Sequence, residues 1–235
     1  MRPDRTVVES WLQTETARLL VTVDSLWDDD LSKDSALPGW SLGHLLSHLA
    51  RNADALGNLL LWARTGVETP MYSSGEQRTT DINVGARRLA AEIISDVVDS
   101  ADRLQANSDK LTAQDWESPV RTAQGRTIPA SLVPWLRLRE VLIHHIDLGA
   151  SVDDVPPLVA AALLDDVAAW TSKQPEWPSL RLGTVDTAQF VTTGAEDVTN
   201  TVSGTAAQLV AWLIGRSAGE HLSSDQPLPI LPPWL

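Results

Sequence analysis

The sequence predicts an α+β protein, with a four-helix bundle in residues 1–150 followed by a small α+β domain in residues 151–235. Two observations support this prediction. Apolar residues recur at helical spacing through most of the first 149 residues, and short β-like runs separated by prolines follow Gly149. A chain of 235 residues is long enough to bury a core. Its hydrophobic content of 43% is too high for a disordered chain.

Four segments of the first domain have helical periodicity. They are residues 7–26, 42–62, 79–111 and 129–149. Ser41 follows a Pro-Gly break and is a suitable N-cap for the second segment, Pro129 can open the fourth, and Gly149 can end it. Four long helices of this kind favour a four-helix bundle.

The second domain begins after an acidic, proline-containing boundary at residues 153–157. The sequence there predicts a helix over 158–171, β-like runs at 180–182, 189–193 and 198–202, and a last helix from about 205 to Arg216. The proline-rich tail from Pro227 onward is expected to be extended.

Composition limits the possible partners and the chemistry. The net charge of −13 argues against nucleic acid or a membrane surface as a partner, although local arginines can still bind a small anionic substrate. No apolar run approaches the roughly 20 residues of a membrane span and no signal sequence is present, so we expect a cytoplasmic protein. The absence of cysteine excludes a thiolate metal site and a cysteine nucleophile, so any thiol must come from outside the chain.

Four of the five histidines form two close pairs, His44 with His48 and His144 with His145. Glu140 lies one helical turn before His144 and shares its face, where a carboxylate is costly unless it is paired or bound to a cation. If the second and fourth helices face each other, His48, Glu140 and His144 converge. Two histidines and one carboxylate are a ligand set of catalytic zinc sites.

A plainer interpretation of the same residues stays open. Glu–His pairs four residues apart are common on solvated helices, and this spacing is much less specific than an HExxH motif. His44 and His48 are also compatible with cap or surface positions, and we interpret the isolated His221 as a surface residue.

Several segments, in this order and spacing, resemble mycothiol-dependent maleylpyruvate isomerases. They are residues 38–50, 62–72, 122–127, 139–149, 215–216 and 232–235. The N-terminal motifs are shared with a wider group of DinB-like helical bundles. The Thr-Pro-Met-Tyr segment at 69–72, the Ala-Gln-Gly-Arg-Thr segment at 123–127 and the C-terminal domain narrow the resemblance to the isomerases.

This resemblance implies a DinB-like four-helix bundle that binds a divalent metal, usually zinc, through His48, Glu140 and His144. It also implies a catalytic and substrate-binding arginine at Arg216 in the small domain, and a second substrate-binding arginine at Arg78. The expected partners are mycothiol and a small anionic diacid, and we expect a monomer.

The family reaction converts maleylpyruvate to fumarylpyruvate within gentisate breakdown. Addition of a thiolate turns the conjugated double bond into a single bond, rotation follows, and loss of the thiol restores the trans alkene. Two alternatives stay open on this basis: a mycothiol S-transferase of the same superfamily, and a non-enzymatic regulatory protein with a structural metal. Three protein ligands argue against the latter, because structural zinc sites are usually closed by four.

Overall fold

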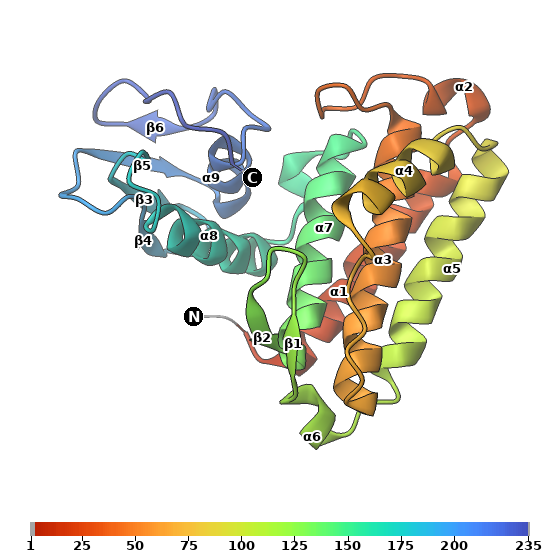
Figure 1. Cartoon of the computed structure of the whole chain (residues 1–235). Coiled ribbons are helices and arrows are strands. Elements are labelled where there is room, and N and C mark those ends of the chain that lie inside the picture. The colour runs from red at the N-terminus through yellow and green to blue at the C-terminus, as the bar shows by residue number, and fades with distance from the viewer. Residues whose placement is uncertain (1–2, 235) are drawn as a thin grey trace. The chain divides into compact units, whose positions relative to one another are not determined.

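The computed structural model describes residues 3–234 and divides the chain into two compact units (Figure 1). One unit is helical and spans Asp4–Leu148, and the other contains the chain from Gly149 onward. The first unit is a helical bundle and the second combines helices with a small sheet, so the predicted α+β fold class is confirmed. None of the described helices is long and apolar enough to cross a membrane.

Four long helices build the bundle: α1 (Arg5–Asp24), α3 (Leu42–Thr65), α5 (Ala90–Ser108) and α7 (Val133–Asp147). Each contributes to a shared apolar core, in which Leu19, Leu49, Ile93 and Val141 are at most 1% exposed. Burial of each such side chain stabilises the fold by about 1.5–3 kcal/mol. The bundle therefore holds α3 and α7 next to each other over several turns.

The N-terminus of α3 is fixed by the predicted cap. The Ser41 hydroxyl accepts a hydrogen bond from the backbone N–H of His44, and the His44 ring in turn accepts one from the backbone N–H of Ser41. Such caps typically contribute about 1 kcal/mol. At the other end Gly66 adopts φ +71°, a conformation that glycine tolerates, and ends the helix.

Shorter elements connect the bundle helices. They are α2 (Asp28–Leu31), α4 (Gly75–Gly85), α6 (Ala113–Trp116), the antiparallel strands β1 (Pro119–Arg121) and β2 (Thr127–Pro129), and the 3₁₀ turn η1 (Ala130–Leu132). The sequence indicated only a loop where β1 and β2 form a hairpin. Gly125, with φ +77°, allows the tight turn between these strands.

The prediction of one continuous helix over residues 79–111 is wrong, because the segment is divided between α4 and α5. Gly85 lies against α3, where an added Cβ would come within 2.7 Å of the Ser47 hydroxyl oxygen. A new helix then starts, because the backbone N–H of Leu89 donates to Glu92 and that of Ala90 donates to Asp28. These two hydrogen bonds satisfy backbone N–H groups that the start of a helix leaves without an intrahelical acceptor.

The second unit contains a four-stranded sheet in the order β4-β3-β5-β6. Its elements are η2 (Val152–Asp154), α8 (Pro157–Thr171), β3 (Leu180–Thr184), β4 (Phe190–Thr192), β5 (Asn200–Gly204), α9 (Ala206–Leu213) and β6 (Ser223–Ser224). Strands β3 and β5 are parallel, and the other two pairings are antiparallel. The last helix ends before the predicted Arg216, since Gly215 adopts φ +74°, and β6 was not predicted.

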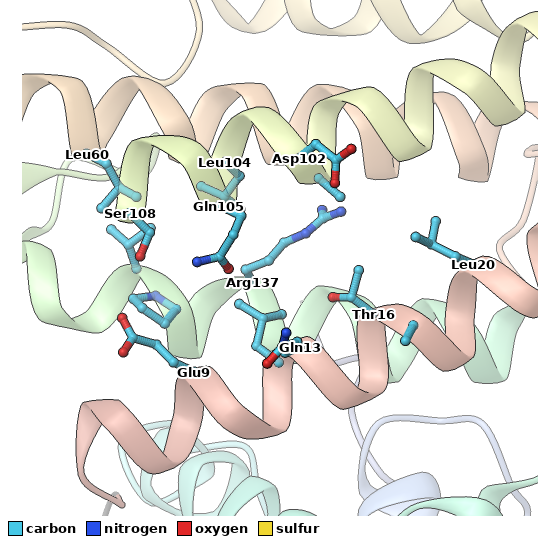
Figure 2. A pocket seen from close by; sticks show the side chains of 15 residues that line it. Glu9, Gln13, Thr16, Leu20, Leu60, Asp102, Leu104, Gln105, Ser108 and Arg137 are labelled. Atoms are coloured by element: carbon cyan, nitrogen blue, oxygen red, sulfur yellow. The ribbon is translucent and has the colours of Figure 1, made fainter. Parts of the chain in front are cut away.

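The bundle also contains a cavity of about 240 Å³ between α1, α5 and α7 (Figure 2). Just over half of its lining residues are aliphatic, and the others are polar or charged. The side chain of Arg137 from α7 extends into it, although only 2% of this residue is exposed to solvent.

Candidate metal centre

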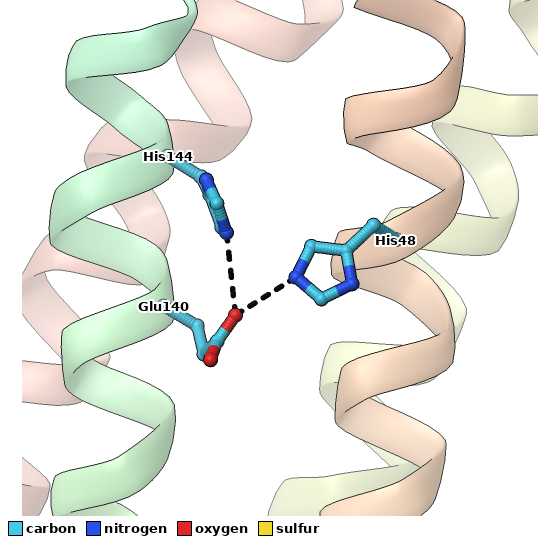
Figure 3. A group of neighbouring side chains, drawn as sticks. All are labelled: His48, Glu140 and His144. Atoms are coloured by element: carbon cyan, nitrogen blue, oxygen red, sulfur yellow. Dashed lines mark hydrogen bonds and ion pairs between the residues drawn. The ribbon is translucent and has the colours of Figure 1, made fainter. Parts of the chain in front are cut away.

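The side chains of His48, Glu140 and His144 converge between α3 and α7 (Figure 3). Glu140 Oε2 lies 2.9 Å from His48 Nε2 and 3.3 Å from His144 Nε2. The two imidazole rings meet nearly at right angles, with centroids 4.9 Å apart. One potential ligand atom from each residue lies within 4.8 Å of the others, so the three side chains can bind the same cation.

The helices explain this convergence. Glu140 and His144 are four residues apart on α7, and this spacing places both on the face directed at α3. His48 lies in the second turn of α3, just after the Ser41 cap that sets where the helix begins. The cap and the packing of the two helices therefore fix the position of His48 relative to α7.

Burial makes the electrostatics of the cluster strong. Burial lowers the pKa of His48 and outweighs its contact with Glu140. Burial opposes ionisation of Glu140, but hydrogen bonds from His144 and His48 hold its pKa well below the usual range. Burial also disfavours a charged His144, yet its contacts with Asp147 and Glu140 raise its pKa. The cluster thus combines an ionised carboxylate with a neutral His48.

The donor set is suited to a divalent metal. Imidazole nitrogens and a carboxylate oxygen bind zinc and similar ions, and three protein ligands leave a position for water or substrate. The side chains of His48 and His144 are 8% and 12% exposed, while that of Glu140 is 32% exposed. A cation held here would be sheltered by protein on one side and reachable from the other.

Asp147 supports His144 and was missed by the sequence analysis. Its side chain is fully buried, and its Oδ2 lies 2.8 Å from His144 Nδ1. A neutral His144 that donates its Nδ1–H to Asp147 presents the lone pair of Nε2 to the cluster. The three-residue spacing from His144 on the predicted helix was the available signal.

Arg78, predicted to bind substrate, lies on α4 beside the cluster. Its Nη2 donates to Nδ1 of His48 over 3.2 Å, and its guanidinium carbon lies 5.6 Å from the ring centre of Tyr72. Burial raises the pKa of Tyr72, against the opposing effect of Arg78, so the phenol stays neutral. Trp40 contacts His48 edge to face, with ring centroids 5.4 Å apart. Sequence reasoning missed Trp40 and Tyr72.

The remaining candidates lie elsewhere. Arg216 belongs to the other unit, where its Nη1 donates to the carbonyl oxygen of Ile214 over 2.8 Å. Its predicted role in catalysis therefore stays a prediction. His44 is part of the α3 cap, the Nε2 of His145 lies 2.8 Å from the Thr22 hydroxyl, and His221 is exposed, as expected.

Comparisons with known proteins agree with the resemblance seen in the motifs. A family model described as the mycothiol maleylpyruvate isomerase N-terminal domain matches residues 12–149, and one described as the MDMPI C-terminal domain matches residues 154–233. A search of curated proteins gave no match.

Two solved structures are similar over nearly the whole chain. A crystal structure of the mycothiol-dependent maleylpyruvate isomerase superposes with a TM-score of 0.92 at 30% identity, covering 99% of this chain and 98% of that one. A crystal structure of a histidine-to-alanine mutant of the mycothiol-dependent maleylpyruvate isomerase gives a TM-score of 0.91 with the same identity and coverage. The chain therefore belongs to the mycothiol maleylpyruvate isomerase family.

Proposed function

We propose that this chain is a mycothiol-dependent maleylpyruvate isomerase, which converts maleylpyruvate to fumarylpyruvate at a zinc-type site. The observation that carries the proposal is the convergence of His48, Glu140 and His144 in a chain of this family. The named structural relatives favour an isomerase over a transferase or a regulatory protein with a structural metal.

Two groups from outside the chain supply chemistry that its residues lack. The thiol of mycothiol supplies a nucleophile for reversible addition to a conjugated double bond, and no cysteine of the chain can do so. A divalent ion, for which zinc is our proposal, supplies a Lewis acid that lowers the pKa of such a thiol.

The residues of the bundle have distinct roles in this proposal. Glu140 contributes the negative charge of the ligand set, and His48 and His144 contribute nitrogens that bind an ion only when each ring is neutral, so metal binding would release any proton held by His144. Asp147 holds His144 in the tautomer whose Nε2 is free to act as a ligand. Trp40 packs edge to face against His48 and helps to fix the orientation of its ring.

In this proposal Arg78 contacts His48 in the metal-free protein and a substrate carboxylate when the metal is bound. When Nε2 of neutral His48 serves as a ligand, Nδ1 carries the ring proton and no longer accepts a hydrogen bond from Arg78. The guanidinium then becomes available to a substrate carboxylate, which its planar fork binds well. The role of Arg216 as a second carboxylate- and oxyanion-binding group rests on the family resemblance alone.

The direct test is the loss of maleylpyruvate absorbance with the purified protein and mycothiol. We expect turnover that depends on both mycothiol and a bound divalent ion, and that His48→Ala abolishes. Absence of turnover by metal-loaded protein would refute the proposal. Consumption of other electrophiles with mycothiol, but not of maleylpyruvate, would indicate a transferase instead.

A further inference from the structure

The bundle contains a cavity that the proposed isomerase chemistry does not use. It has a volume of about 240 Å³ and lies between α1, α5 and α7 (Figure 2). An engineered apolar cavity of about 150 Å³ is large enough to bind benzene. This cavity is therefore large enough for a substituted ring or a short alkyl chain.

Its inner wall combines aliphatic groups with one buried cation. Leu60, Leu104 and Val133 are each at most 7% exposed, and Arg137 is 2% exposed. Exposed residues such as Gln13, Asp102 and Gln105 line the same cavity, so it reaches the surface of the bundle between α1 and α5. The lining is thus apolar and basic inside and polar at the opening.

The hydrogen bonds of Arg137 are incomplete. Its Nη1 donates to the carbonyl oxygen of Leu49 over 2.8 Å and to Asn52 Oδ1 over 2.9 Å. Its buried Nη2 has no hydrogen-bond partner among the described residues. Both acceptors of Nη1 are neutral, so neither of these hydrogen bonds balances the charge of the guanidinium.

A buried guanidinium without an anion in direct contact is costly, and buried charges in proteins are normally paired. Burial accordingly lowers the pKa of Arg137 to about 10, although the negative charges of Glu140 and Asp54 favour the charged guanidinium. An anionic acceptor that reached Nη2 from the inner end of the cavity would complete the hydrogen bonds of the guanidinium.

We propose that this cavity is a binding site for a small monocarboxylate with an apolar body, whose carboxylate is held by Arg137 and whose body packs against the leucines of α3 and α5. Glu9 and Asp102 also line the cavity, and their negative charges disfavour any carboxylate that Arg137 does not hold, so a monocarboxylate is better suited to the site than a diacid. The site therefore differs in preference from the centre at His48, for which a diacid substrate is proposed.

The test uses hexanoate as the probe and hexanol as its neutral counterpart, measured with the full-length protein by isothermal titration calorimetry. We expect saturable binding of hexanoate and at least tenfold weaker binding of hexanol. Because a carboxylate can also bind a metal, the titration is repeated with His48→Ala, which should bind hexanoate as the parent does. Loss of hexanoate binding in that variant would place the probe at the metal centre and overturn the proposal.

Two phenylalanine substitutions on α5 provide a matched pair. Ala101→Phe fills the cavity and should weaken hexanoate binding at least tenfold, while Ala106→Phe, at an exposed position outside the cavity lining, should leave it unchanged. Both should keep metal content and isomerase turnover, which also separates this test from that of the proposed function. Arg137→Met should bind hexanol and hexanoate equally if it folds. Absence of saturable hexanoate binding to the parent, or equal binding of both probes by the parent, would overturn the proposal.

Discussion

Replacement of Asp147 by asparagine tests the metal centre without removing a ligand. Asparagine has nearly the same size and keeps an oxygen that can accept from His144 Nδ1, but it lacks the negative charge. Since the carboxylate is fully buried and only 2.8 Å from that nitrogen, its charge acts on His144 with little screening by water. The substitution therefore makes His144 a weaker ligand.

The expected loss of metal affinity is about tenfold to a hundredfold, which corresponds to about 1.4–2.7 kcal/mol. Asp147→Ala should lose more, because it removes the acceptor as well as the charge. His221→Ala, which changes an exposed histidine without any predicted role, should keep the affinity of the parent.

Competition with a chromophoric chelator measures these affinities, and circular dichroism of the metal-free proteins checks that the helices are retained. The reasoning predicts the order parent, then Asp147→Asn, then Asp147→Ala. If the folded asparagine variant binds the metal as tightly as the parent does, Asp147 does not support the centre through His144.

Three further predictions concern the thiol, the second unit and the bundle. Turnover should require an added low-molecular-weight thiol and resist alkylation of the protein alone, because the chain has no cysteine; a normal rate without thiol would refute this. Arg216→Lys should keep metal and melting temperature but lose about a hundredfold in kcat, since a lost donor to developing charge costs about 3 kcal/mol; a kcat within about threefold of the parent would make Arg216 structural. Burial opposes ionisation of Asp96, but hydrogen bonds from Arg88 and Arg51 lower its pKa in the folded protein. The ionised Asp96 therefore stabilises the fold above the unfolded pKa of about 3.9, and this contribution is lost as the pH falls through the lower folded pKa. Asp96→Asn should therefore lower the free energy of unfolding by about 1–3 kcal/mol at pH 7 and by little at pH 2, measured by urea denaturation; an equal loss at both pH values would refute this cause.

The sequence by itself determined much of the helical framework. The Ser41 cap and the apolar periodicity predicted α3, because capping and helical spacing are local properties. The four-residue spacing of Glu140 and His144 likewise predicted two side chains on one face of α7. The absence of cysteine excluded a thiol nucleophile within the chain, because composition does not depend on how the chain folds.

Contacts between distant segments were decided by the tertiary structure. Periodicity continued through residues 79–111, but the close approach of Gly85 to Ser47 and the cap that Asp28 provides to Ala90 divided this segment. Neither contact has a local signal in the sequence, because the partners are separated by 38 and 62 residues.

The candidate metal centre depends on both local sequence spacing and tertiary packing. Local spacing placed Glu140 beside His144, but only the packing of α3 against α7 brings His48 within 2.9 Å of Glu140, across 92 residues of chain. The same packing buries Arg137 against Leu49 and Asn52 and leaves its second terminal nitrogen without an acceptor among the described residues. Sequence sets which face of a helix a side chain occupies, whereas the chemistry of that side chain depends on the neighbours, burial and charge that tertiary packing supplies.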